Sequence, residues 1–354
     1  MSKPSSAVAR GQGGPRGPMN RDLVQSILCD AGHRICERCH ATLREQSVEK
    51  RSSVYKQGAD DTIYQIDRDV EELLLPVLAA AATALGGIVL VAEGVGEGDA
   101  PLVLPEGMAE SAAAVRFLVD PIDGTRGLMY DKRSAFFLAG AAVNRGAGTR
   151  LSDIEVAVMV ELPTSRSYLS DTICAQRGGG ARRYTRDMNT GRVENRPLTP
   201  SRAVSIQGGF AQVARFFPPG RDRLAALEER LVAELFPNPP PGKAILFEDQ
   251  YISSGGQLYE LLVGHDRFVA ELRSRLYRQL AAEGRSVGHV CHPYDVSAHL
   301  IGIEAGLRIT DSAGEALDGP FDTTSPVDWI GYANAAIEAE VRPVLSRLIR
   351  EMLS

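Results

Sequence analysis

Two aspartates three positions apart carry the clearest chemical signal in this sequence. Asp120 and Asp123 follow the hydrophobic residues 117–119 and have a proline between them. The proline fixes the backbone, so both carboxylates can point at one spot at the end of a strand. Gly124 and Thr125 come next and can open a helix whose N–H groups favour an anion. This pattern predicts a site for a hard cation beside a phosphate cradle, although an Asp-Pro turn followed by an Asp N-cap has the same sequence.

Three further acids stand at the ends of predicted elements. Glu93 closes a strand, Asp67 begins a helix, and Asp295 begins a helix that carries Glu304. An acid at a helix start is commonly only a cap, so neither Asp67 nor Asp295 is informative alone. Carboxylates gathered without the His and Cys ligands typical of zinc sites suit Mg²⁺, or Mn²⁺, bound through oxygen.

These residues resemble the signatures of the inositol monophosphatase-like superfamily of magnesium-dependent, lithium-sensitive phosphatases. The first signature, Asp-Pro-Ile/Leu-Asp-Gly-Thr, appears unaltered at residues 120–125. The second, an aromatic-Asp pair followed by small residues and then Glu-Ala-Gly, matches residues 294–298 and 304–306. Weaker matches are the approach to Asp67, the strand ending in Glu93, and the glycine turn at residues 178–181. The similarity keeps the family's order from about Arg21 to the C-terminus.

The resemblance implies roles for individual residues. The metal ligands would be Glu93, Asp120, Asp123, Asp295 and the backbone carbonyl of Ile122. Asp67 would hold a further metal ion or orient water with Thr125, and the N–H groups of Gly124 and Thr125 would receive the phosphate. In such a site a metal-activated water, polarised by Glu93 and Thr125, attacks phosphorus in line, while a second metal about 4 Å away stabilises the leaving oxygen.

Departures from the family pattern concern the substrate. Gly94 follows Glu93 where relatives often have a second acid, and residues 286–290 lack the Glu of inositol-specific members. Residues 126–128, Arg-Gly-Leu, resemble the Lys-Gly-Phe of the nucleotide bisphosphatase branch. Residues 254–257 resemble a substrate-binding turn, so Arg126 and Gly256 are the candidate substrate-binding residues.

The sequence thus predicts a Mg²⁺-dependent phosphomonoesterase that hydrolyses a small sugar or polyol phosphate. Two alternatives stay open, namely a 3′,5′-nucleotide bisphosphate phosphatase and a non-catalytic binding or assembly module that keeps the fold. A decayed module should have lost at least one of the acids or Thr125, and all of them are present.

Composition limits the partners. The 354 residues include 39 basic and 45 acidic ones, for a net charge of −6, which argues against a nucleic-acid polymer as ligand. Residues 73–92 carry no charge over the length of a membrane span, but Pro76 and the pair at 86–87 divide them into a helix and a strand, so no membrane association is expected. Five cysteines and no recognisable leader predict a cytoplasmic protein with reduced thiols. The family resemblance suggests a homodimer.

Helices and strands mix along the chain, which predicts stacked layers of helix and sheet. The resemblance implies the α/β layered sandwich of alternating helix and sheet layers that is called the sugar-phosphatase fold. We expect a disordered tail at residues 1–18, a metal-binding subdomain at 19–165, and a second subdomain at 166–354 that completes the active site. Helices are expected at 21–46, 67–85, 222–235, 257–263, 295–305 and 328–353. Strands are expected at 88–92, 116–119, 135–143, 154–161, 172–176 and 308–310.

Two segments suggest other functions and are interpreted as structural. The Cys-x-x-Cys-His sequence at residues 36–40 spells a c-type haem attachment pattern. Haem attachment requires export, a zinc site requires further ligands, and a helix would place both cysteines on one face, so we expect buried thiols. The arginine-rich residues 177–202 are interpreted as a solvated hairpin, with an oligomer contact as the alternative.

Overall fold

The computed structural model describes residues 19–57, 62–95 and 100–354, and describes no side chains between residues 54 and 71. The tail expected at residues 1–18 lies outside the described residues. No helix in the described part of the chain is both long and apolar enough to cross a bilayer. The helices are α1 (Arg21–Glu45), α2 (Val48–Arg51), α3 (Gln65–Ala82), α4 (Thr125–Met129), α5 (Arg221–Leu235), α6 (Ser254–Leu262), α7 (Arg273–Ala282), α8 (His299–Glu304) and α9 (Ala335–Met352).

A large twisted sheet forms the centre of the molecule, with the strand order β10-β9-β8-β7-β6-β5-β3-β4. Only β3 and β5 run parallel, and the other neighbours are antiparallel. The strands are β3 (Ile88–Ala92), β4 (Leu102–Leu104), β5 (Val115–Asp123), β6 (Ala135–Val143), β7 (Val156–Leu162), β8 (Leu169–Gln176), β9 (Ala181–Asp187) and β10 (Val193–Arg196). A separate hairpin pairs β1 (Val54–Gln57) with β2 (Thr62–Tyr64).

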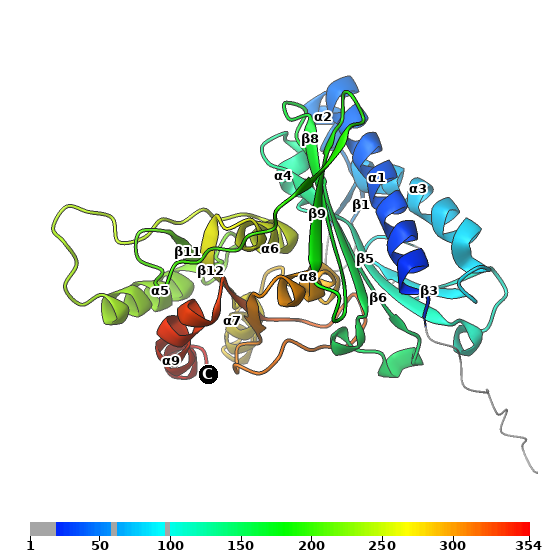
Figure 1. Ribbon diagram of the computed structural model, residues 1–354. Helices are drawn as coiled ribbons and strands as arrows, with labels where there is room; N and C mark the ends of the chain where they lie inside the picture. The colour runs from blue at the N-terminus through cyan, green and yellow to red at the C-terminus, as the bar shows by residue number, and fades with distance from the viewer. Residues whose placement is uncertain (1–18, 58–61, 96–99) are drawn as a thin grey trace, which may run out of the picture.

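Helices α1 and α3 cover one face of this sheet (Figure 1). Gly32 lets α1 approach closely, because a Cβ there would lie 2.6 Å from Val160 Cγ2. Cys36 and Cys39 are buried in α1 within this first core, as the sequence predicted. The haem-like pattern is therefore part of a helix–sheet contact.

The other face of the sheet packs on α6 and α8, and these helices separate it from a smaller sheet (Figure 1). The smaller sheet has the order β11-β12-β14-β13 and consists of β11 (Phe210–Val213), β12 (Asp266–Glu271), β13 (Arg308–Thr310) and β14 (Trp329–Tyr332). Its far face packs on α5, α7 and α9 in a third core. Helix and sheet layers thus alternate, which confirms the predicted α/β layered sandwich.

Several element boundaries differ from the expectation. The helix expected at 295–305 is a 3₁₀ turn (Tyr294–Val296) followed by the short α8. The helix expected from residue 328 begins only at Ala335, because Trp329–Tyr332 forms the strand β14 and pairs with β12 and β13. Asn334 caps this helix, since its side chain accepts hydrogen bonds from N–H groups of the first turn. Strands β11 and β12 and helix α7 were not predicted, whereas the hairpin expected in the arginine-rich segment is present as β9 and β10.

The large sheet includes strands on both sides of residue 165, since β7 ends at Leu162 and pairs with β8. The division into subdomains at 165/166 stays a prediction.

Glu304, from the second signature, joins α8 to the glycine turn between β8 and β9. Its two carboxylate oxygens accept hydrogen bonds from Gly178 N at 2.7 Å and Gly180 N at 2.9 Å. We expect Glu304→Ala to lower the free energy of unfolding by about 1 kcal/mol, because two charge-assisted bonds are lost at a partly exposed position. Urea denaturation checks this, and Glu304→Gln, which keeps one acceptor, should lose less. If Glu304→Ala also lost cation binding, the role of Glu304 would not be limited to holding the glycine turn.

Candidate active site

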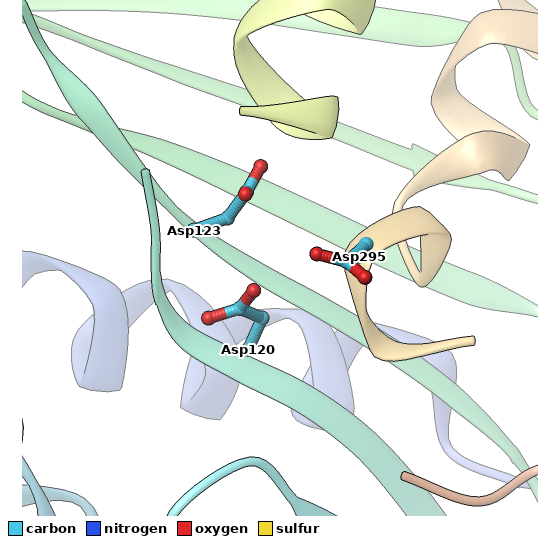
Figure 2. A group of neighbouring side chains, drawn as sticks. All are labelled: Asp120, Asp123 and Asp295. Carbon is cyan, nitrogen blue, oxygen red and sulfur yellow. The ribbon is translucent and has the colours of Figure 1, made fainter. Parts of the chain in front are cut away.

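Three aspartates from distant parts of the sequence meet beside the large sheet. Asp120 and Asp123 come from β5, and Asp295 comes from the 3₁₀ turn Tyr294–Val296 (Figure 2). One carboxylate oxygen of each lies within 4.8 Å of the others. Asp120 is 1% exposed and Asp123 is 6% exposed. The structure therefore brings together three of the four carboxylates predicted as metal ligands in a largely buried cluster.

A break in strand register makes the cluster possible. Residues three apart on a regular strand point to opposite faces of a sheet. Asp120 pairs with Leu138 and Asp123 pairs with Phe136, so β5 contains one residue more than β6 in this interval. This bulge turns Asp123 to the same side as Asp120, and Pro121 fits there because a bulge does not require its missing N–H. Ile122 N donates to Asp120 Oδ1 at 3.0 Å and fixes that carboxylate.

The start of α6 holds Asp123. Ser253 Oγ donates to Asp123 Oδ2 at 2.8 Å, and Gly255 N also donates to the same oxygen. A side chain at position 255 would not fit, since its Cβ would lie 2.7 Å from Asp123 Oδ2. Asp295 is fixed from its own turn, because its Oδ2 accepts a hydrogen bond from His292 N at 2.6 Å.

Burial raises the pKa of all three carboxyl groups, and repulsion between carboxylates adds to the shift at Asp120 and Asp295. Burial, and then the negative charges of Glu93, Asp123 and Asp295, hold the pKa of Asp120 well above its usual range. Burial and the charge of Asp123 do the same to the pKa of Asp295. Burial raises the pKa of Asp123 to about 6, although hydrogen bonds from Gly255 and Ser253 oppose the shift. Buried acids of this kind are stable as anions only next to a cation, and their all-oxygen donors fit Mg²⁺ or Mn²⁺.

Glu93 and Thr125 lie beside the cluster. Glu93 follows β3 directly, its N–H donates to Val119 O at 3.2 Å, and its charge raises the pKa of Asp120. Thr125 Oγ1 donates to the Ile122 carbonyl at 2.8 Å and occupies one of the two lone pairs of this predicted ligand. The Glu93 carboxylate is not part of the group within 4.8 Å, and the roles of Glu93 and Thr125 stay predictions.

Solved structures with this arrangement of elements include known phosphatases. SuhB from Bartonella henselae is 17% identical, with a TM-score of 0.60 over 93% of this chain and 98% of that chain. Fructose-1,6-bisphosphatase from Leishmania major is 13% identical, with a TM-score of 0.65 over 95% and 100%. Inositol monophosphatase from Anabaena is 14% identical, with a TM-score of 0.56 over 94% and 97%. The chain has the inositol monophosphatase fold. No family model matches the sequence, and no curated protein does.

Within the inositol monophosphatase fold, the other predicted site residues have varied surroundings. Gly124 precedes α4 with φ of 97°, in the left-handed region. The Arg126 guanidinium lies over the Phe217 ring, with its central carbon 5.4 Å from the ring centroid. Gly256 is buried, and its N–H donates to Ser253 Oγ at 2.7 Å, so its role in substrate binding stays a prediction. Asp67 lies in the first turn of α3, but its side chain is outside the described residues.

Sequence reasoning missed several residues that shape this site. Ser253 and Gly255 hold Asp123, whereas the sequence placed Gly255 only in a substrate-binding turn at residues 254–257 and did not mark Ser253. Arg273 is 3% exposed, forms an ion pair with the fully buried Glu271, and lowers the pKa of both Asp123 and Asp295. No motif in the sequence marks Arg273, and the elements around it, β12 and α7, were not predicted.

The raised pKa values predict how cation binding depends on pH. The pKa of Asp123 is about 6 in the folded, cation-free protein and 3.8 in an ordinary Asp. Between these two pH values the folded protein binds more protons than the unfolded chain. The contribution of the cluster to the free energy of unfolding therefore falls as the pH rises through this window. A cation must displace these protons, so stabilisation by Mg²⁺ should grow from pH 5.5 to pH 7.5. It should reach about 2.7 kcal/mol when the Mg²⁺ concentration is 100 times Kd. Thermal unfolding with and without Mg²⁺ measures this, and a constant or shrinking shift would contradict it.

Proposed function

We propose that the protein is a divalent-cation-dependent phosphomonoesterase that hydrolyses a small sugar or polyol phosphate. The observation that carries the proposal is the cluster of Asp120, Asp123 and Asp295 in a fold shared with inositol monophosphatase and fructose-1,6-bisphosphatase structures. Carboxylates that are buried this deeply and repel one another need a cation, and a phosphate ester is a natural ligand of a site in which carboxylates hold such a cation.

The chain's own residues have separable tasks in this proposal. Mg²⁺ or Mn²⁺ held by the three aspartates, Glu93 and the Ile122 carbonyl would supply the positive charge that polarises a phosphate ester and a water. Glu93 accepts a proton from the attacking water, and Thr125 orients this water. The N–H groups of Gly124 and Thr125, at the start of α4, receive phosphate oxygens. The surrounding cores keep these groups in place.

A nucleoside 3′,5′-bisphosphate is the second candidate substrate. It is favoured by Arg126, which immediately follows the phosphate-binding residues and lies over the ring of Phe217. A guanidinium beside an aromatic ring is suited to a ligand that has both an additional phosphate and a planar base.

A panel of phosphate esters tests the proposal. Wild type and Asp120→Asn are assayed with Mg²⁺ on sugar monophosphates, polyol monophosphates and nucleoside 3′,5′-bisphosphates. We expect hydrolysis by wild type alone, fastest on a sugar or polyol phosphate. Faster hydrolysis of the bisphosphates would favour the second candidate. Equal activity in both proteins, or none in either, contradicts the proposed phosphatase activity and favours a binding module with this fold.

A further inference from the structure

A short line of buried rings leads to Glu93 from the segment that carries Asp295. His292 is 6% exposed and Tyr294 is 4% exposed. Their rings stack, with centroids 5.3 Å apart and planes inclined by 14°. Tyr294 Oη lies 3.2 Å from His292 Nδ1 and donates to Glu93 Oε1 at 3.4 Å. The hydroxyl thus lies between a buried imidazole and a predicted metal ligand.

The same segment also holds Asp295. His292 N donates to Asp295 Oδ2 at 2.6 Å, and Asp295 directly follows Tyr294 in the 3₁₀ turn. A shift of this turn would therefore move Asp295 and the Tyr294 hydroxyl together. The stacked, buried rings have little room to rotate, so the hydroxyl is a fixed point.

Glu93 needs a fixed point more than the aspartates do. It follows the end of β3 and is only partly buried, whereas Asp120 and Asp123 lie within β5. Gly94 comes next with φ of 68°, and nothing lies within 4 Å of where its Cβ would be. A long, partly exposed side chain at a strand end has many rotamers, and a hydrogen bond to its charged end restricts them.

We propose that Tyr294 is a positioning residue of the active site, whose hydroxyl directs the Glu93 carboxylate toward Asp120. A tyrosine hydroxyl has one proton, so when it donates to Glu93 it accepts a hydrogen bond from His292 Nδ1–H. The contact of 3.4 Å is long for such a bond, and contacts of this kind commonly shorten when the ligand binds. This inference rests on the proposed function for its catalytic consequence, but not for its effect on cation binding.

The test is a double-mutant cycle on Tyr294 and Glu93, read by Mn²⁺ binding in calorimetry and by kinetics. Tyr294→Phe should weaken Mn²⁺ binding and lower kcat, each by about 10- to 100-fold, with a smaller change in KM, as is typical when the partner of a metal ligand is lost. In a Glu93→Gln background the same change should have little further effect, because the group that Tyr294 positions is already altered. His292→Phe, which keeps the stack but removes Nδ1, is a second variant and should act in the same direction.

Controls separate positioning from folding. Tyr332→Phe removes another buried hydroxyl, in the core between the smaller sheet and α9, and should bind Mn²⁺ as wild type does. Tyr294→Trp restores a ring with an N–H donor and should recover part of the affinity. Wild-type affinity in Tyr294→Phe, or an equal loss with and without Glu93→Gln, overturns the inference.

The two proposals can fail separately. A wild type that binds Mn²⁺ but hydrolyses no phosphate ester contradicts the proposed function, and the binding cycle still decides the role of Tyr294. A wild type that binds no Mn²⁺ overturns both.

Discussion

The Asp120→Asn variant is expected to lose phosphatase activity by about 1,000-fold or more, because a Lewis acid contributes several kcal/mol to such reactions and each 1.36 kcal/mol is a factor of ten. Without a cation, the same variant should unfold at a higher temperature than wild type. Asp120 is buried and repelled by Glu93, Asp123 and Asp295, and a neutral amide removes that repulsion. Opposite signs for activity and stability are typical of residues placed for function.

Thermal unfolding with a chelator and then with Mg²⁺ measures the second effect. Mg²⁺ should raise the unfolding temperature of wild type and have little effect on Asp120→Asn. Asp30→Asn is the matched control, because Asp30 is exposed on α1, across the sheet from the cluster, and should change neither property. A cation-free Asp120→Asn protein that is less stable than wild type would show that Asp120 has a mainly structural role.

The Arg273→Met variant is expected to have the largest effect on stability, a loss of about 3 to 5 kcal/mol. Arg273 Nε lies 2.8 Å from Glu271 Oε1 and 2.9 Å from Oε2, and Glu271 is 0% exposed. Removing the guanidinium leaves a charge buried without its partner. It also removes a positive charge that lowers the pKa of Asp123 and Asp295, so the pKa of both carboxyl groups should rise further.

Urea denaturation measures this stability loss. Adding Glu271→Leu to Arg273→Met should recover much of it, because an apolar pair replaces the unpaired charge. Arg34→Met, which breaks an exposed ion pair with Asp30, should have little measurable effect. If the double variant is as unstable as Arg273→Met alone, packing around the guanidinium is the main cause. Phe216 supplies such packing, since its ring centroid lies 4.2 Å from the guanidinium carbon of Arg273.

Apolar runs bounded by turn residues, and helical apolar spacing in residues 21–46, underlie most of the elements that the sequence predicted well. The strands at 88–92, 135–143 and 308–310 have the predicted bounds as β3, β6 and β13, and α1 differs from the prediction by one residue. Trp329–Tyr332 was included in the helix predicted at 328–353 but forms the strand β14. Its strand state depends on pairing with β12 and β13, which lie far away in the sequence.

The sequence by itself predicted the chemistry of the candidate site, since the carboxylates and their spacing around a proline indicate an oxygen-donor cation site. It did not determine that Asp120 and Asp123 share a face of the sheet, because residues three apart on a strand diverge unless a bulge intervenes, and the bulge exists only in the pairing of β5 with β6. The tertiary structure also decided which groups contact the acids, namely Ser253 and Gly255 at Asp123 and the Tyr294 hydroxyl at Glu93. Their contacts depend on packing between elements that are distant in the chain, and local sequence carries no record of that packing.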